Sequence, residues 1–441
     1  MSEHSLEKWK EIKPMTQFQG PPEEPIGAES REVAPGGAQS VDALNYGASY
    51  YQLNQIGVPA VHELGYTGAG VTLTIIDTGY RKTHQAFATA YAEGRVLAEY
   101  DFIQNDANTY NEPGDWASEM NHGTNVWSIA GGAASGNIYG PAYGANFILC
   151  KTEHVGYELR VEEDNWVAAM EFADSIGTDV ITSSLGYLVF DDSCHCSYTF
   201  ADMNGRTAIT SIAASMADSL GIVLCKSAGN SGPAASTITA PGDAFNILAV
   251  GSVDGNGTIA SSSSRGPTAD GRMKPEVCAR GVSTVMATAS YDNIYGSGSG
   301  TSYAAPLVAG AACLVIEAHP DWTPYQVREA LKASGNHALS PDNTYGWGVI
   351  RVDSALRINT GCCTGKVGNV NGIGDDEPTI GDVSLLIDFL FISGAPPACI
   401  AEADVNQSGG STPLRKDITI GDIAMLIDHL FISGAPLLNC L

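Results

Sequence analysis

The chain has 441 residues, and at about 100–200 residues per domain this length allows two to four domains. Hydrophobic residues make up 44% of the chain, enough for a sizeable core, whereas charged residues make up only 16%. The 49 acidic and 22 basic residues give a net charge of -27. This balance excludes nucleic acid and anionic lipid as partners and leaves carboxylates available for cations, Ca²⁺ above all.

The N-terminal region has no apolar segment that could target or anchor the protein. No run of about 18 apolar residues occurs anywhere, so we expect no transmembrane helix. Residues 1–13 contain three lysines but no apolar core, so they are not a signal peptide. Residues 1–45 are polar, rich in Pro and Gly and without periodicity, which predicts a tail, a linker or the remnant of a propeptide.

Residues 46–360 alternate between short apolar runs and longer amphipathic stretches. This alternation predicts an α/β domain with a mostly parallel sheet, whose sites gather where the strands end. The predicted strands are Val71–Ile76, Phe147–Cys150, Val180–Ser183, Gly221–Cys225 and Ile247–Val250. The predicted helices include Glu162–Ser175, Ala208–Leu220 and Pro324–Ala333.

Residues 361–441 contain an internal repeat. The segment Thr379–Val383 returns 40 residues later as Thr419–Ile423, and both copies continue into an apolar stripe of helical spacing. We therefore expect a small pseudo-symmetric domain of short helices, separated from the rest at Gly361-Cys362-Cys363. The cysteines at 362, 363, 399 and 440 suggest disulfide bridges and an oxidising compartment, whereas those at 150, 225, 278 and 313 are expected to be buried thiols.

Asp77 lies where the first predicted strand ends, in the segment Ile75-Ile76-Asp77-Thr78-Gly79. An Asp in such a turn is commonly a structural cap. Asp-Thr-Gly also marks aspartic proteases, but those need two such loops because two carboxylates must share a proton. No second copy occurs, so that class is excluded.

Three further segments contain candidate reactive residues. His122, in His122-Gly123-Thr124, is at the start of a predicted helix and is either a surface residue or a base that reaches across a site. Ser302, in the Gly-rich segment 298–306, is either a helix cap or a nucleophile facing free backbone N–H groups, and Pro306 is expected in or near the first turn. Asn230, in a Gly-rich loop after a strand, is either a turn residue or an oxyanion donor.

The order Asp77, His122, Ser302, with separations of 45 and 180 residues, is the subtilisin order. Over about residues 46–360 the chain resembles the subtilisin-like serine protease family. Its segments Asp-Thr-Gly, His-Gly-Thr, Ser-Ala-Gly-Asn and Gly-Thr-Ser-Tyr-Ala-Ala-Pro match the four signatures of that family in order. One departure is Asn125, where the family usually has a non-catalytic His.

This resemblance implies a doubly wound, subtilisin-like sheet and a set of roles. Ser302 would attack a peptide carbonyl, His122 would accept its proton, and Asp77 would orient the imidazole. Asn230 and the backbone N–H of Ser302 would stabilise the oxyanion.

By the same resemblance, extended substrate would pair with the strand Ser184, Leu185 and Gly186. The specificity pocket would lie between that strand and Ala228, Gly229 and Asn230, with Thr239 at its base, and its lack of an obvious acidic residue does not favour strict Arg/Lys specificity.

The C-terminal repeats resemble the dockerin type I module, a pair of EF-hand-like Ca²⁺ loops each followed by a helix. The implied structural Ca²⁺ ligands are Asn369, Asn371 and Asp382 in the first copy and Asp404, Asn406, Ser408 and Asp422 in the second. An EF-hand loop has about 12 residues, whereas these spans are longer, and Thr-x-x-Asp is also a capping box that needs no metal. A dockerin-like module implies a cohesin-like or cell-surface partner.

The sequence therefore predicts a secreted serine endopeptidase acting on polypeptides, with a C-terminal docking module. Two alternatives stay open: an inactive scaffold that binds through its repeats, and an intracellular protease. Family members are usually made with a chaperone-like prodomain, and residues 1–45 are too short for a whole one, so we expect the N-terminus to be incomplete.

Overall fold

The computed structural model describes residues 44–191, 197–357, 367–370, 378–392, 397, 399–408 and 417–438. The chain divides after Asn45 into a short first unit and a second unit, Tyr46–Leu441. Nearly all of the expected tail, residues 1–45, lies outside the described residues. The description below therefore concerns the second unit.

A seven-stranded, fully parallel sheet forms the centre of the α/β region, in the order β2-β5-β1-β6-β7-β8-β9. The chain starts in the middle of the sheet at β1 and adds strands on both sides, so the carboxyl end of β1 is a switch point of the kind where α/β proteins form sites. The strands are β1 (Thr72–Asp77), β2 (Val96–Asp101), β5 (Asn146–Lys151), β6 (Val180–Ser183), β7 (Val223–Ser227), β8 (Leu248–Val253) and β9 (Val277–Arg280). Two small hairpins lie outside it, β3 (Ala133–Ala134) with β4 (Ile138–Tyr139) and β10 (Thr284–Ala287) with β11 (Tyr295–Gly298).

The predicted parallel sheet is confirmed, with differences at its margins. β7 and β8 begin later than expected and end two or three residues further on. β2 and β9 were not predicted. β2 is an edge strand whose residues are mostly half-exposed, so its sequence lacks the continuous apolar run that marks a buried strand, and β9 has only four residues.

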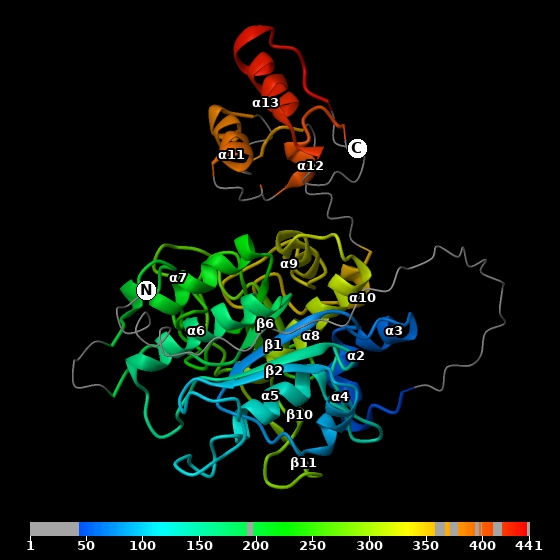
Figure 1. The fold of residues 1–441 in the computed structure, drawn as a ribbon, viewed down its shortest axis with the longest axis vertical. Coiled ribbons are helices and arrows are strands. Elements are labelled where there is room, and N and C mark those ends of the chain that lie inside the picture. Colours follow the sequence, from blue (N-terminus) through cyan, green and yellow to red (C-terminus); the bar gives the residue numbers. More distant parts are fainter. Residues whose placement is uncertain are drawn as a thin grey trace, which may run out of the picture. The chain divides into compact units, whose positions relative to one another are not determined.

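Helices cover both faces of the sheet, as in a doubly wound fold (Figure 1). One core contains residues of α5, α8 and α9, and a second core on the other face contains residues of α6 and α7. The α-helices of this region are α2 (Tyr50–Gln55), α3 (Val58–Glu63), α4 (Ala88–Ala92), α5 (Asn121–Gly131), α6 (Arg160–Ile176), α7 (Ile209–Met216), α8 (Thr301–Ala318), α9 (Pro324–Ala333) and α10 (Val352–Ala355). Short 3₁₀ turns are η1 (Gly47–Ser49), η2 (Gln85–Phe87), η3 (Phe200–Asp202) and η4 (Ala217–Leu220).

Helix α8 is the buried central helix of the α/β region. Among the described residues it is the one helix long and apolar enough to cross a membrane, and 72% of that stretch is buried inside the protein. Pro306 is its sixth residue, one turn later than expected. A proline there cannot donate to the carbonyl of residue 302, four positions earlier. That carbonyl instead accepts a hydrogen bond from Ser184 Oγ at 2.9 Å.

The C-terminal repeats form a small, mainly helical core of their own. The helices are α11 (Ile380–Phe391), α12 (Ile400–Ala403) and α13 (Ile420–Ile427), which continues as a π-helical turn, η6 (Asp428–Ile432). Val383 and Leu386 of α11 pack in one cluster with Ile423 and Leu426 of α13, as the repeated stripe predicted.

The described cysteines agree with the expectation of buried free thiols in the α/β region and of disulfide bonding near the C-terminus. The thiols of Cys150, Cys225, Cys278 and Cys313 are free and buried. Cys399 is disulfide-bonded. The other C-terminal cysteines lie outside the described residues.

Trp127 of α5 provides a test of the first core. It is fully buried, stacks on Phe87 with ring centroids 3.6 Å apart, and meets Tyr80 edge to face. Trp127→Ala should lower the free energy of unfolding by about 3–5 kcal/mol, because it leaves a large cavity. Guanidinium unfolding in a Ser302→Ala background measures this without self-digestion. Trp116→Ala, whose side chain is 52% exposed, is the matched control and should change little.

Candidate active site

Asp77, His122 and Ser302 lie on three elements that meet at the carboxyl edge of the sheet. Asp77 is the last residue of β1, His122 the second residue of α5 and Ser302 the second residue of α8. His122 Nδ1 and Asp77 Oδ1 are hydrogen-bonded at 2.7 Å. Residues separated by 45 positions in the chain therefore form a direct acid–imidazole pair.

Asp77 holds the imidazole in one orientation. Its carboxylate is completely buried, and Oδ1 also accepts a hydrogen bond from the Thr78 N–H at 2.8 Å. With Nδ1 bonded to the carboxylate, Nε2 of His122 is the nitrogen left to exchange protons. Burial lowers the pKa of His122, but the charge and hydrogen bond of Asp77 outweigh it, so the pKa lies above its ordinary value.

Ser302 does not cap α8. The N-cap is Gly300, so the capping interpretation is wrong, and Ser302 lies one residue inside the helix. Its Oγ donates to the Ser184 carbonyl at 3.3 Å while its carbonyl accepts from Ser184 Oγ. Within the described part of the chain, no hydrogen bond joins Ser302 Oγ to His122. Such contacts are often loose in a free enzyme and tighten when substrate binds.

Asn230 is held against the start of α8. Its Oδ1 accepts from the backbone N–H of Thr301 at 2.9 Å and from Thr301 Oγ1 at 3.1 Å. Thr301 also hydrogen-bonds to the backbone of Gly229. Because Oδ1 is occupied, the amide group presents Nδ2 as its donor. Sequence reasoning missed Thr301, which precedes the serine and fixes this orientation.

The predicted substrate-binding segments lie close together. Ser184, Leu185 and Gly186 directly follow β6, and Ala228 and Gly229 directly follow β7. A Cβ added to Gly186 would come within 2.8 Å of Thr239 Oγ1, and one added to Gly229 within 3.2 Å. Thr239 therefore lies between the two segments, and any side chain at either glycine would crowd it.

Asn125, the departure in the histidine motif, makes its hydrogen bonds to residues other than Asp77 and His122. Its amide lies 3.3 Å from the Tyr303 hydroxyl. In the opposite amide orientation its nitrogen donates to the carbonyls of Asn121 and Ala287. Tyr303 in turn lies beside the His122 ring, with centroids 6.0 Å apart.

Comparison with known proteins identifies the family. The subtilase family, Peptidase_S8, matches residues 68–348. Serine protease AprX of Bacillus subtilis is 31% identical over 66% of this chain and 67% of its own length, and subtilisin E of the same species is 33% identical over 70% and 71%. The chain belongs to the subtilase family. It is a serine endopeptidase of the subtilisin-like type.

Solved structures support the same fold. Fervidolysin from Fervidobacterium pennivorans, described as a keratinolytic enzyme related to subtilisin, matches 76% of this chain and 50% of its own, with a TM-score of 0.57 at 23% identity. A protease from Pseudoalteromonas arctica matches 72% of this chain and 99% of its own, with a TM-score of 0.55 at 24% identity. The subtilisin-like arrangement of the central sheet is thus confirmed.

This subtilase has an acidic group beside Tyr187, the residue after the segment 184–186, that sequence reasoning did not single out. Carboxylate oxygens of Glu153, Glu158 and Glu162 lie within 4.8 Å of one another. Tyr187 donates to Glu153 at 2.6 Å, and the backbone N–H groups of residues 154 and 159 donate to Glu162. Burial and the charge of Glu162 raise the pKa of Glu158 to about 7 and also raise that of Glu153. Proton uptake by Glu153 and Glu158 is therefore favoured over full ionisation of all three carboxylates.

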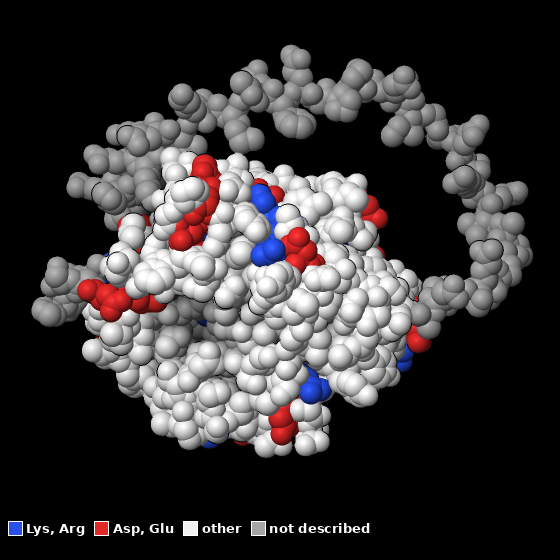
Figure 2. Space-filling model, turned by 90° about the horizontal axis from the view of Figure 1, so that it is seen from below, with Lys and Arg blue, Asp and Glu red and all other residues white. Residues whose placement is uncertain are grey.

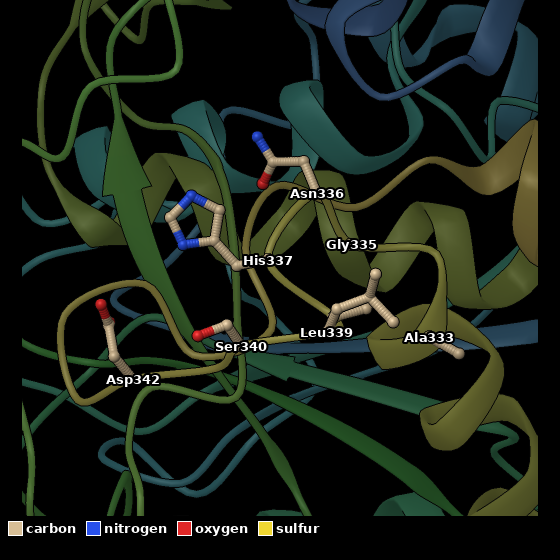
Figure 3. A pocket seen from close by; sticks show the side chains of 8 residues that line it. Ala333, Gly335, Asn336, His337, Leu339, Ser340 and Asp342 are labelled. Atoms are coloured by element: carbon tan, nitrogen blue, oxygen red, sulfur yellow. The ribbon is translucent and has the colours of Figure 1, made fainter.

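A hollow lies in the loop after α9 (Figure 3). It has a volume of 620 Å³ and is lined by residues that include Asn336, His337, Leu339 and Asp342. None of the predicted site residues lines it.

The face drawn in Figure 2 carries few charged side chains, with carboxylates in scattered groups.

The predicted metal ligands of the second repeat lie close together. Asp404 Oδ1 accepts from the N–H of Ser408, as does Asn406 Oδ1, and the N–H of Asn406 donates to Asp422 Oδ1 at 3.0 Å. Asp422 Oδ2 is engaged by Thr419 in a capping box.

The first repeat has the same capping box. Here Asp382 Oδ2 accepts from the N–H and Oγ1 of Thr379. Asn369 donates its backbone N–H to Glu402, and Asn371 lies outside the described residues.

The raised pKa of His122 predicts a pH profile. Catalysis by a neutral imidazole requires kcat/KM to rise with pH through a midpoint above 6.5, the ordinary value. Asp77→Asn removes the charge that raises the pKa, so this midpoint should fall, and kcat should drop by about 10⁴ because the amide no longer holds the imidazole in the required tautomer. Hydrolysis of a fluorogenic peptide between pH 5 and 9 measures both. Asp292→Asn, at a carboxylate that is 54% exposed, should leave the profile unchanged.

Proposed function

We propose that Asp77, His122 and Ser302 form the catalytic triad of this endopeptidase. The observation that carries the proposal is the 2.7 Å bond between His122 and the buried Asp77 carboxylate, at the sheet edge where Ser302 is the second residue of α8. Ser302 Oγ attacks the scissile carbonyl while His122 Nε2 takes its proton, giving a tetrahedral intermediate. His122 then gives this proton to the leaving amine, which leaves an acyl-enzyme. His122 next takes a proton from water, the water attacks the acyl carbonyl, and the proton returns to Ser302 Oγ as the acid product leaves.

The oxyanion of that intermediate would be stabilised by two donors. One is Nδ2 of Asn230, which is oriented by the bonds of its Oδ1 to Thr301. The other is the backbone N–H of Ser302, which has no partner within the helix because it belongs to the first turn. The positive end of the α8 dipole acts in the same direction.

Substrate would bind as an extended strand beside Ser184, Leu185 and Gly186. Its specificity side chain would enter between that segment and Ala228 and Gly229, with Thr239 at the base. The closeness of Thr239 Oγ1 to both Gly186 and Gly229 supports this placement. The neutral lining favours uncharged side chains.

The roles of Ser302 and Asn230 can be separated by their magnitudes. Ser302→Ala should abolish peptide hydrolysis and labelling by a fluorophosphonate, because it removes the nucleophile. Asn230→Ala should keep the label but lower kcat by about 10²–10³, since one oxyanion donor is lost. Asn256→Ala, in an exposed turn, is the control. Undiminished activity of Ser302→Ala would overturn the triad, and an unlabelled wild type would favour the alternative of an inactive scaffold.

We further propose that residues 361–441 are a dockerin-like module that binds Ca²⁺ through the second repeat. The donor set fits a hard cation, because Asp404 Oδ1 and Asn406 Oδ1 of the loop both accept from the N–H of Ser408, and the N–H of Asn406 donates to Asp422 Oδ1 at the start of α13. Bound Ca²⁺ would stabilise the loop structurally. The module would hold a cohesin-like or cell-surface partner outside the cell, and the disulfide of Cys399 supports an oxidising compartment.

Calcium binding can be measured by calorimetry on the full-length Ser302→Ala protein. We expect heat of binding at up to millimolar Ca²⁺, and Asp404→Ala should weaken it because one charged ligand is lost. Asp388→Ala, on α11 of the same module, is the matched control. If Asp404→Ala and the control bind Ca²⁺ as the parent does, the second repeat is a capped helix only.

A further inference from the structure

The base and the nucleophile lie on two helices that are not bonded to each other through these residues. His122 is the second residue of α5, and Ser302 is the second residue of α8. In the described part of the chain, Ser302 Oγ donates to the Ser184 carbonyl and makes no hydrogen bond to His122. The distance that a proton must cross between them therefore depends on how α5 is held against α8.

Asn125 and Tyr303 form a hydrogen-bonded link between the two helices. Asn125 follows His122 by three positions, so both lie on one side of α5, and Tyr303 directly follows Ser302 on α8. The amide of Asn125 lies 3.3 Å from the Tyr303 hydroxyl. Among the residues that the structure describes, no other hydrogen bond joins α5 to α8.

The amide of Asn125 is also bonded to the residue that precedes the base. In one orientation its nitrogen donates to the carbonyl of Ala287 in β10 at 2.8 Å and to the carbonyl of Asn121 at 3.1 Å. Its oxygen then faces the Tyr303 hydroxyl, which donates to it, so every polar atom of the amide has a partner. Asn125 is thus bonded to the residue before His122 and to the residue after Ser302.

The ring of Tyr303 borders the imidazole as well. The two ring centroids are 6.0 Å apart, and the ring planes are inclined by 35°. A Cβ added to Gly298 of β11 would come within 2.6 Å of Tyr303 Cε2, so the ring packs closely against this hairpin. The imidazole is bonded to Asp77 through Nδ1 alone and can pivot about that atom. A neighbouring ring that is itself fixed limits this pivot.

We propose that Asn125 and Tyr303 are positioning residues, which hold the imidazole of His122 and the Oγ of Ser302 at the separation that proton transfer requires. The inference rests on the roles proposed for His122 and Ser302. Neither side chain exchanges a proton with the substrate. Because the separation of base and nucleophile matters only in the chemical step, loss of the link lowers kcat and leaves KM unchanged.

The link can be broken from either side. We expect Tyr303→Phe and Asn125→Ala each to lower kcat for a fluorogenic peptide by about tenfold, with KM unchanged. The double variant should be no slower than Asn125→Ala, because both changes remove the same interaction. Tyr91→Phe is the matched control, since its half-buried hydroxyl donates to Glu99 at 3.0 Å and to none of the proposed site residues, and its kcat should stay at the wild-type value.

Four results would overturn the proposal: a wild-type kcat in Tyr303→Phe, single losses that multiply in the double variant, a rise in KM in place of a fall in kcat, or an equal fall in Tyr91→Phe. Guanidinium unfolding in the Ser302→Ala background shows whether each variant folds. If Asn125→Ala does not fold, Tyr303→Phe, which removes only a hydroxyl, decides alone. Failure of the triad is distinguishable, because it would appear as an active Ser302→Ala enzyme, whereas an unchanged Tyr303→Phe enzyme removes only the role of the link.

Discussion

The arrangement of the candidate active site depends on one buried carboxylate, that of Asp77. Asp77 is fully withdrawn from water, a position that costs free energy unless the charge is compensated by hydrogen bonds. The Thr78 N–H and His122 Nδ1 both supply such bonds to Oδ1. Both bonds depend on the topology of the sheet. Because β1 lies inside a parallel sheet, Thr78 and the start of α5 can both approach its carboxyl end. Both bonds go to Oδ1, whereas Oδ2 is buried and has no hydrogen-bond partner among the described residues, so the position of the carboxylate depends on the bonds from Thr78 and His122.

The sequence predicted the elements that carry long apolar patterns and the residues that carry family signatures. β1 and β6 are buried runs, and α9 begins at its Pro324 and ends at Ala333 as expected. The weaker edge strand β2 escaped prediction because half-exposed residues carry little periodic signal. Ser302 lies at the N-terminus of α8 as expected, but the N-cap is Gly300, and a glycine cap leaves no side-chain signature in the sequence.

Other features depended on contacts between distant segments and could not be read from the chain. Thr301 orients Asn230 from 71 positions away, and a threonine before the serine gives no sign of that partner. The bond from Asn125 to α8 was likewise hidden, because 178 positions separate Asn125 from its partner. The acidic group Glu153, Glu158 and Glu162 shares this property: its repulsion exists only in the folded chain.

The proline of α8 has a mechanical consequence. Since residue 306 cannot donate, the carbonyl of Ser302 is free to receive Ser184 Oγ, and Ser302 Oγ reaches back to the Ser184 carbonyl. These two hydrogen bonds join α8, which carries the proposed nucleophile, to the segment after β6 that we propose binds substrate. A peptide bound along that segment would therefore lie beside the serine that is hydrogen-bonded to Ser302. A helix that satisfied all its own carbonyls would lack this coupling.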